Sequence, residues 1–347
     1  MRKASPIKKA TLEDVARVAG VGPMTVSRTI NGHPYVAADT AKKVHAAIRQ
    51  LGYRPNRAAR ILTGKSSKSI GLIVPDLSDT FFSVVSHAVQ DAARQAGYLV
   101  WLAASNGDSL IEEAQVEEMT NHPVDGILLV PADSRSKYLK AAVSGGTPVV
   151  TIDRSADLAH SDSVEVENYA GARLAIEHLI SHGHKRIACL VMNSHLRPVR
   201  ERIAGYEERM RQAELPFRKV VLSDEATAKS VLTELFALAD RPDALFTANN
   251  ACTICVIKAL RALKIEVPRD VALVGFDDVD FYTLLTPPVT TIRQPGAELG
   301  RTAVRLLLQK IKSESSVSVV RTILPVTLIV RESCGCKKGK ERSMIGC

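Results

Sequence analysis

From residue 69 onward, short apolar runs alternate with amphipathic segments, and this alternation limits the possible folds more than any other feature of the sequence. The runs are four to six residues long and are flanked by turn-forming residues, which is typical of buried strands. We expect strands at 70–74, 98–103, 126–130, 148–152, 186–191, 244–247 and 271–275. Segments such as 82–96 and 169–182 predict helices between them. Buried strands that alternate with helices form parallel sheets covered on both faces, and this many strands favours two sheets over one.

The loops that follow these strands are the places to look for a ligand. In parallel α/β folds, ligands bind beyond the carboxyl ends of the strands. The loops concerned are residues 75–82, Asp153-Arg154, Asn249-Asn250 and Asp277-Asp278. The sequence therefore predicts that a ligand binds at these ends.

The first 52 residues have a different pattern, which predicts three short helices. Thr11 is a candidate N-cap for the first helix, and Gly20 can adopt the left-handed conformation that ends it. Pro23 suits the first turn of a second helix at 23–30, and a third is expected at about 39–51. Two helices joined by a short glycine turn are typical of a helix-turn-helix, and a small helical bundle with a solvated basic face is the alternative.

Charge is distributed unevenly along the chain. Residues 1–68 contain 14 lysines and arginines and three acidic residues, a formal charge of +11, whereas the whole chain of 347 residues carries +9. The remainder is therefore close to neutral, at −2. This distribution indicates that the basic N-terminal module binds a polyanion, whereas the near-neutral remainder of the chain has a different function.

The expected localisation follows from the absence of a membrane span and of a signal peptide in the sequence. No apolar run approaches the 18 residues of a membrane span, and residues 1–9 have no apolar stretch for a signal peptide. We expect a cytoplasmic protein. Six irregularly spaced cysteines favour reduced thiols over a disulfide framework, namely Cys189, Cys252, Cys255, Cys334, Cys336 and Cys347.

Nine collinear stretches resemble the LacI/GalR family of bacterial transcription regulators. They are TLEDVA (11–16), MTVSR (24–28), LGYRPNRAAR (51–60), GLIVPD (71–76), VDGIL (124–128), GHKRIA (183–188), VGFDD (274–278), TTIRQP (290–295) and LIVRESC (328–334). The resemblance implies an α-helical headpiece, then an α/β core of two subdomains like a periplasmic sugar-binding protein. It implies a DNA-binding domain at 9–55, a hinge helix and linker at 56–68, an effector-binding and dimerisation core at 69–338 and a tail at 339–347. Subdomain one would comprise about 69–166 and 295–325, and subdomain two about 167–294 and 326–338, with crossings near 166, 294 and 325.

The same resemblance implies a repressor that binds a palindromic operator as a dimer. The recognition helix would begin at Pro23 and Met24, where uncharged side chains favour apolar contacts with bases, and Arg28 has the geometry to bind a guanine edge. A hinge helix at about 56–62 would insert Leu62 into the minor groove. Gly22 and Ala37 depart from the family, which usually has hydroxyl residues there. The expected DNA-binding residues are Thr11, Pro23, Met24, Thr25, Ser27, Arg28, Asn31, Tyr35, Asn56, Arg57, Ala59 and Leu62.

A second implied site lies between the subdomains and binds a small carbohydrate-like effector. Its expected residues are Asp76, Asp79, Phe81, Phe82, Asp153, Glu167, Arg202, Asn249 and Asp277. Carboxylates, an amide and a guanidinium around an aromatic surface suit a polyhydroxylated ligand. Because His195, Arg197, Arg200 and Arg202 are expected to cluster near the mouth of this site, we expect a small or anionic effector, such as a sugar acid or sugar phosphate, in preference to a neutral disaccharide.

Other motifs indicate no further chemistry. Cys252 and Cys255 have metal or redox spacing but no partner ligands, so we interpret them as structural. His178 and His182 could share a helix face, but they lack the glutamate of a zinc protease motif. No phosphate-loop motif or nucleophile elbow is present, so we expect no enzyme activity, no metal and no cofactor.

Two function classes remain open at this point. One is an effector-responsive repressor, and the other is a periplasmic-binding-protein-like sugar receptor without a DNA role. The helical headpiece and the missing signal peptide favour the repressor. The C-terminal tail has no heptad repeat, so a dimer is expected in preference to a tetramer.

Overall fold

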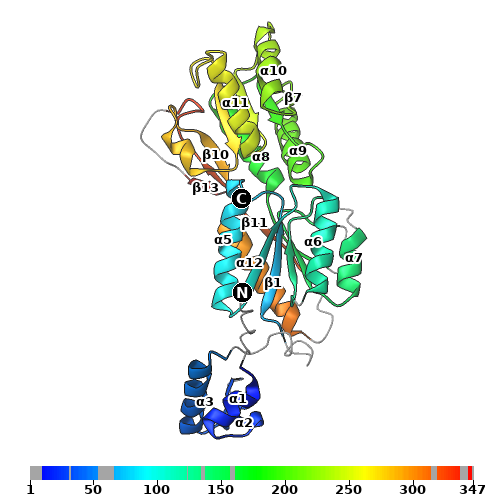
Figure 1. Ribbon diagram of the computed structural model, residues 1–347. Coiled ribbons are helices and arrows are strands. Elements are labelled where there is room, and N and C mark those ends of the chain that lie inside the picture. The colour runs from blue at the N-terminus through cyan, green and yellow to red at the C-terminus, as the bar shows by residue number, and fades with distance from the viewer. Residues whose placement is uncertain are drawn as a thin grey trace, which may run out of the picture. The chain divides into compact units, whose positions relative to one another are not determined.

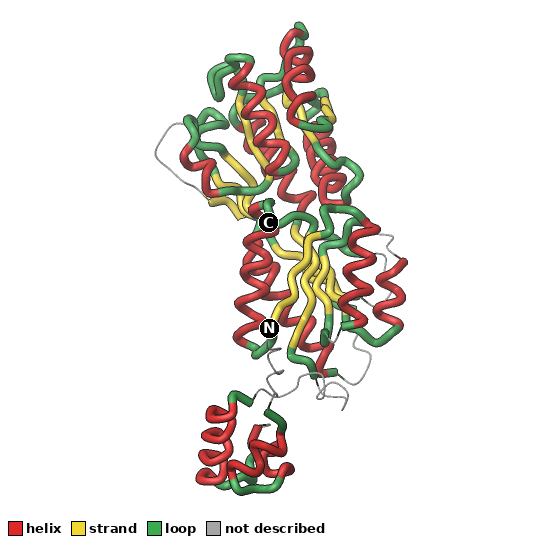
Figure 2. Tube along the Cα trace, in the orientation of Figure 1, coloured by secondary structure: helices red, strands yellow, loops and turns green. Residues whose placement is uncertain are grey.

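A computed structural model describes residues 10–30, 33–53, 66–122, 124–133, 137–156, 161–313, 319–336 and 343–345. The chain divides into two compact units, Met1–Ser67 and Lys68–Cys347, which we call the headpiece and the core. Figure 1 labels the helices and strands, and Figure 2 shows that the described headpiece is helical whereas the core is α/β. None of the described helices has the length and apolar character needed to cross a membrane.

The headpiece contains α1 (Leu12–Ala19), α2 (Pro23–Ile30) and α3 (Ala38–Leu51). Gly20 ends α1 with a φ of 65°, and its N–H donates to the carbonyls of Ala16 and Arg17. This left-handed cap costs a glycine little, because it has no Cβ to clash with the backbone. The three helices pack around one small apolar core made by Val15, Ala16, Ala19, Val26, Val44 and Ala47. All three predicted helices are therefore confirmed.

The first subdomain of the core contains a sheet in the order β11-β5-β4-β3-β1-β2, and every pair in it is parallel. Its strands are β1 (Ser69–Val74), β2 (Leu99–Ala104), β3 (Ile127–Leu129), β4 (Val149–Ile152), β5 (Asp162–Val166) and β11 (Arg321–Leu324). Its helices are α5 (Thr80–Gln95), α6 (Ser109–Asn121), α7 (Lys137–Ser144) and α12 (Gly296–Lys312). Helices α5 and α12 cover one face, and α6 and α7 cover the other (Figure 1).

The second subdomain contains a sheet in the order β13-β12-β10-β9-β8-β6-β7. Its strands are β6 (Ile187–Val191), β7 (Arg218–Val221), β8 (Ala244–Thr247), β9 (Ala272–Phe276), β10 (Thr290–Arg293), β12 (Thr327–Ile329) and β13 (Ser343–Ile345). Its helices are α8 (Asn168–Ser181), α9 (Arg197–Gln212), α10 (Glu225–Ala237), α11 (Asn250–Ala262) and the short 3-10 helix η1 (Asp280–Leu284).

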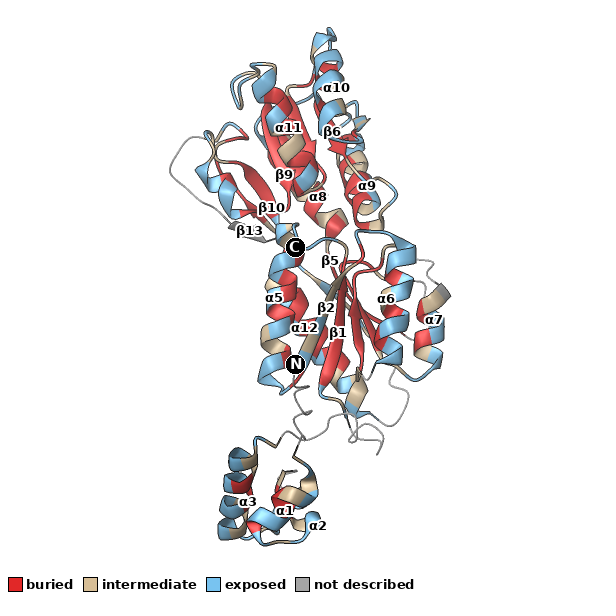
Figure 3. Cartoon of the chain, in the orientation of Figure 1, coloured by how far each residue is buried: buried red, intermediate tan, exposed pale blue. Residues whose placement is uncertain are grey.

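Alternate residues of the central strands face opposite helical layers. In β1, Ile70, Leu72 and Val74 join the apolar cluster that contains α5 and α12 residues. Ile73 joins the cluster under α6 and α7 instead. Figure 3 shows the strands as the buried layer between partly exposed helices. A strand buried on both faces needs apolar residues at every position, which explains the continuous apolar runs of the sequence.

The chain passes between the sheets three times. It leaves β5 of the first sheet for α8 through Glu167, and it returns from β10 to α12 through Gln294 and Pro295. The last passage joins β11 to β12 through residues 325–326. Three segments of the chain therefore connect the two subdomains.

Each of the seven predicted strands is present, with bounds shifted by at most one residue. The prediction missed the other six described strands, which are β5, β7, β10, β11, β12 and β13. At β5, Asp162 and Glu165 interrupt the apolar pattern. Both carboxylates are buried, and their partners come from distant segments. Lys310 lies 3.2 Å from Asp162, and Nε of Arg321 donates to Glu165 at 2.9 Å.

The second sheet differs in two details from the expected parallel sheets and tail. It is not wholly parallel, since β12 pairs antiparallel with β10 and β13 pairs antiparallel with β12. Within the segment expected as a tail, the described residues Ser343–Ile345 form β13 and pair with the core strand β12. A three-residue strand has too little pattern to be recognised from sequence, and its pairing partner alone defines it.

The close packing of α8 against α9 generates a stability prediction. A Cβ on Gly205 of α9 would overlap the backbone oxygen of Tyr169 on α8. We expect Gly205→Ala to lower the free energy of unfolding by about 1–3 kcal/mol, the range seen for overpacked cores. Urea denaturation followed by circular dichroism measures it. Ala204→Ser, at an exposed position of the same helix, is the control and should change stability by less than about 0.5 kcal/mol. Equal effects of the two substitutions would contradict the close approach.

Candidate functional site

A cleft of about 470 Å³ lies between the subdomains, beyond the carboxyl ends of strands from both sheets. Loops that follow β1 and β4 in the first subdomain and β8 and β9 in the second contribute to its walls. Its size is in the range typical of small-molecule sites. The polar or charged residues that line it are Asp76, Asp79, Asn106, Asp153, Arg154, Asn193, His195, Arg202, Asn249, Asn250, Asp277 and Gln294.

Two aspartates occupy equivalent places in the two subdomains. Asp153 follows directly after β4 and Asp277 directly after β9, and both have a left-handed backbone, with φ of 68° and 74°. Both side chains are buried. A non-glycine residue in this region is strained by about 1–3 kcal/mol, and such strain is found preferentially at binding sites. The sharp turn directs each carboxylate into the cleft at the end of its strand.

Arg202 of α9 is the central cation of the cleft wall. Its Nε donates to Oδ1 of Asn168 at 2.9 Å, and its Nη1 donates to the carbonyl of Ala248 at 2.8 Å. Nη1 also lies 3.8 Å from Oδ2 of Asp277, and the guanidinium stacks 3.6 Å from the centre of the Phe276 ring. Burial lowers the pKa of Arg202, and the charge of Asp277 opposes that shift. A buried guanidinium with this many partners is fixed in orientation.

Asp79 and Asn250 join the two walls. Asp79 caps the N-terminus of α5, where its side chain accepts from the N–H of Phe81 at 2.9 Å. Nδ2 of Asn250, at the start of α11, donates to Oδ1 of Asp79 at 3.0 Å. The backbone N–H of Asn250 donates to Asp277 at 3.1 Å. The cleft therefore has polar contacts between its walls that a ligand could replace or extend.

Burial shifts the titration of two cleft carboxylates. Burial, followed by the charge of Asp277, raises the pKa of Asp79 above the usual aspartate value. Burial also raises the pKa of Asp153, although Arg154 forms an ion pair with it at 3.2 Å. Desolvation therefore outweighs the pairing at Asp153. Both carboxylates become protonated at higher pH than ordinary aspartates.

An aromatic surface completes the site. Phe81 and Phe82, in the first turn of α5, both line the cleft, with ring centres 5.1 Å apart in an edge-to-face arrangement. Phe82 is buried and Phe81 is half-buried. Apolar ring faces beside carboxylates suit a ligand with a polar edge and an apolar face.

The expected basic cluster at the mouth of the cleft is wrong. His195 and Arg202 line the cleft, but Arg197 and Arg200 do not. Arg197 pairs with Glu201 at 2.9 Å and lies 3.8 Å from Glu165, because its place at the start of α9 directs it towards β5. Nη1 of Arg200 donates to the carbonyl of His195 at 2.5 Å. Among the described residues lining the cleft, four aspartates stand against two arginines, Arg154 and Arg202.

Eight of the nine residues expected at the effector site line this cleft, and Glu167 does not. Glu167 lies in the passage from β5 to α8, where its N–H donates to the carbonyl of Leu324 at 3.0 Å. The sequence named Asn250 and Arg154 only as members of candidate loops. It did not identify Asn106, Asn193 or Gln294, because each lies in a loop whose distance from the site depends on the packing of the two subdomains.

The headpiece presents a second surface on α2. Pro23, Met24 and Arg28 are exposed, and Thr25 and Ser27 are half-buried. Met24 is 69% exposed, whereas Val26 is fully buried in the headpiece core. The side chain of Val26 therefore supports the helix, and Met24 is available to a partner.

Some of the other expected DNA-binding residues lie within the described part of the headpiece, and the rest do not. Tyr35 is 89% exposed, and Thr11 forms a capping box with Asp14, whose N–H donates to the Thr11 hydroxyl at 3.2 Å. Ala37 makes no side-chain cap for α3, as its departure from the family pattern implies. The candidates Asn31, Asn56, Arg57, Ala59 and Leu62, and the hinge helix, lie outside the described residues.

Family models match both parts of the chain. The model described as "Bacterial regulatory proteins, lacI family" matches residues 11–56, and "Periplasmic binding protein-like domain" matches residues 176–334. The first match covers the three headpiece helices, and the second covers most of the second subdomain.

Known proteins resemble the chain over nearly its whole length. The HTH-type transcriptional repressor PurR of Photobacterium profundum is 31% identical over 329 residues, which are 93% of this chain and 98% of PurR. The Lac repressor dimer bound to operator and the anti-inducer ONPF matches with a TM-score of 0.82 and 28% identity, over 94% of this chain and 99% of that one. A LacI family transcriptional regulator from Enterococcus faecium with bound ribose matches with a TM-score of 0.70 and 26% identity, over 76% and 98%.

Proposed function

Because this chain belongs to the lacI family of bacterial regulatory proteins, and is a DNA-binding transcription regulator with no expected enzyme activity, we propose that it is a repressor controlled by a small neutral sugar. It binds a palindromic operator as a dimer, and its effector binds in the cleft between the core subdomains. We infer a neutral effector from the charges of the cleft lining, in which four aspartates outnumber two arginines.

Carboxylates and an amide suit the hydroxyl groups of a sugar. Each ionised carboxylate accepts two or more hydrogen bonds, and adjacent sugar hydroxyls can donate to both of its oxygens. We assign this role to Asp76, Asp79, Asp153 and Asp277, with Asn249 and Arg202 as further polar partners. Phe81 and Phe82 offer an apolar surface for one face of the sugar ring. A phosphate group would instead add a negative charge next to these aspartates, which is unfavourable.

Binding in the cleft is linked to DNA binding through the position of the two subdomains. A ligand that contacts both walls favours one relative position of the subdomains over another. The linkage is reciprocal, so a sugar that weakens operator binding must itself bind more weakly to the DNA complex. The hydrogen bond between Asp79 and Asn250 joins the two walls, so a ligand bound in the cleft would either compete with this bond or add to it.

We expect calorimetric titration of the full chain to show that D-ribose binds at least tenfold more tightly than ribose 5-phosphate. The expectation follows from the acidic lining, since like charges across a dry contact cost several kcal/mol. Ribose is the probe because a relative binds it, and other neutral pentoses and hexoses complete the panel. Tight binding of the phosphate ester, with no neutral sugar bound, would refute the neutral effector and leave the DNA-binding assignment untouched.

The affinity for the bound neutral sugar should fall as the pH decreases from about 7.5 towards 5, while the protein remains folded. The sugar hydroxyls donate to ionised carboxylates, and the pKa values of Asp79 and Asp153 are raised, so protonation begins above the usual aspartate range. Calorimetry at several pH values measures the slope. Asp79→Asn should reduce that slope, and Asp91→Asn, at a half-buried position of α5 outside the cleft lining, should leave it unchanged. A slope that is the same in all three proteins would exclude Asp79 as the titrating group.

The recognition surface on α2 is tested with promoter DNA next to the gene of this protein. We expect Arg28→Ala to weaken binding to the footprinted operator by about 1–3 kcal/mol, the range for one bidentate base contact, with little change on unrelated DNA. Fluorescence anisotropy with both DNAs measures the two affinities. The control is Arg49→Ala on α3, which removes the same charge from an exposed headpiece position. Should Arg28→Ala weaken both DNAs equally, Arg28 contacts phosphate and does not read a base.

A further inference from the structure

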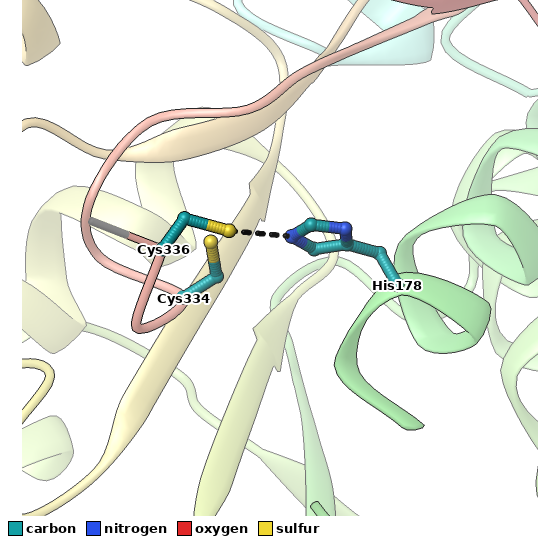
Figure 4. A group of neighbouring side chains, drawn as sticks. All are labelled: His178, Cys334 and Cys336. Atoms are coloured by element: carbon teal, nitrogen blue, oxygen red, sulfur yellow. Dashed lines mark hydrogen bonds between the residues drawn. The ribbon is translucent and has the colours of Figure 1, made fainter. Parts of the chain in front are cut away.

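Four side chains with metal-binding atoms lie together at the end of α8 that is remote from the cleft. His178 in the last turn of α8 is grouped with Cys334 and Cys336, and their ligand atoms all lie within 4.8 Å of one another. His182, directly after the helix, places Nε2 at 2.9 Å from Sγ of Cys336. Figure 4 shows the two cysteines of the C-terminal segment directed towards His178 of α8. Sequence patterns assigned no partner to either pair, because 152 residues separate His182 from Cys334.

The local backbone directs both histidines to one face of α8 and both cysteines towards that face. His178 and His182 are four residues apart, and their ring centres are 4.4 Å apart. Residues at this spacing share a helix face. Gly335 lies between the two cysteines with a φ of 93°, and its N–H donates to the carbonyl of Glu332 at 3.0 Å. This turn, which favours glycine, allows both thiols to face α8.

Two of the distances between ligand atoms are close to those of a tetrahedral cation site. Zinc binds sulfur at about 2.3 Å and histidine nitrogen at about 2.0–2.1 Å, so neighbouring ligand atoms in a tetrahedron lie roughly 3.3–3.8 Å apart. Nε2 of His178 lies 4.0 Å from Sγ of Cys336, and Nε2 of His182 lies 2.9 Å from the same sulfur. Both separations can reach the ideal range through small rotations of the side chains.

The surroundings of the cluster prepare these atoms for a metal. Nδ1 of His182 lies 2.8 Å from the carbonyl oxygen of His178, which can only accept, so Nδ1 carries the proton and Nε2 presents a lone pair. A second ring nitrogen that donates to a backbone carbonyl is typical of metal-binding histidines. The hydroxyl of Thr290 donates to Sγ of Cys334 at 3.2 Å, which would stabilise a thiolate there.

The charge states of the cluster agree with this arrangement. Burial, followed by the charge of His182, lowers the pKa of His178 to about 4, so its imidazole is neutral and can coordinate. Burial raises the pKa of Cys336 to about 12, so without a cation its thiol stays protonated. A bound cation takes the place of the thiol protons, and two protons are released to solvent for each ion bound.

We propose that His178, His182, Cys334 and Cys336 bind one Zn²⁺ ion in a closed, structural site. Two thiolates and two imidazoles form the ligand set that selects zinc, and four protein ligands leave no position open for chemistry. The ion would join the C-terminal segment after β12 to the end of α8. It lies about 15 Å along α8 from Asn168, the partner of Arg202, and is therefore separate from the effector cleft.

The test measures metal in the full chain, purified without a histidine tag and under reducing conditions. Mass spectrometry of the elements should give one zinc per chain, and cobalt added to the zinc-free protein should give the absorption of cobalt bound to thiolates. We expect Cys336→Ser and His182→Asn to weaken metal binding at least about 100-fold, since loss of even an outer partner costs 10–100-fold. Both residues are partly or fully exposed, so the variants should fold, which circular dichroism verifies.

Two matched variants serve as controls. His184→Asn changes a histidine two residues away that pairs with Asp243 at 3.6 Å, and Cys255→Ser changes a half-buried thiol outside the cluster. Both should keep one zinc per chain. The proposal is overturned if the unaltered chain binds no zinc with excess metal present. It is also overturned if all variants bind zinc equally, or if Cys334 and Cys336 form a disulfide in the reduced preparation.

Discussion

The buried guanidinium of Arg202 connects the parts of the core on which ligand binding depends. It contacts Asn168 at the start of α8, the carbonyl of Ala248 after β8 and the carboxylate of Asp277 after β9, and it stacks on Phe276. A buried cation is tolerated only when such partners replace its lost hydration. The need to satisfy one charge therefore fixes two strand ends and two helices of the cleft wall relative to one another.

The cleft contains buried carboxylates that lower the stability of the folded protein. Asp79, Asp153 and Asp277 each lose hydration, and two of them have raised pKa values as a result. Asp153 and Asp277 also adopt strained backbone conformations. These costs are located at the carboxyl ends of strands, where a polyhydroxylated ligand can restore the lost hydrogen bonds. In the proposed function, Asp79 couples ligand binding to the relative position of the two subdomains, because it lines the cleft and also accepts a hydrogen bond from Asn250 on the opposite wall.

Local patterns predicted much of the fold. The seven apolar runs became strands because a strand buried on both faces must be apolar throughout, and the three headpiece helices follow from their caps and spacing. The prediction missed six described strands, among them β5, where Asp162 and Glu165 are buried against Lys310 and Arg321. Their polarity resembles that of a loop until the distant partners are known. The predicted basic cluster at the cleft is wrong for the same reason, because Arg197 forms ion pairs with Glu165 and Glu201, which the sequence did not identify as its partners.

The sequence by itself determined the seven predicted strands, the three headpiece helices, the basic headpiece and the loops that supply most of the cleft residues, because these depend on local periodicity and on positions that directly follow strands. Only the tertiary structure decided which charges face the cleft and which are neutralised elsewhere. It also brought His178 and His182 to Cys334 and Cys336, where the sequence predicted no metal site. The physical reason is that a ligand set is defined by distance in space. Sequence spacing fixes that distance within one helix or one turn, and packing alone fixes it between them.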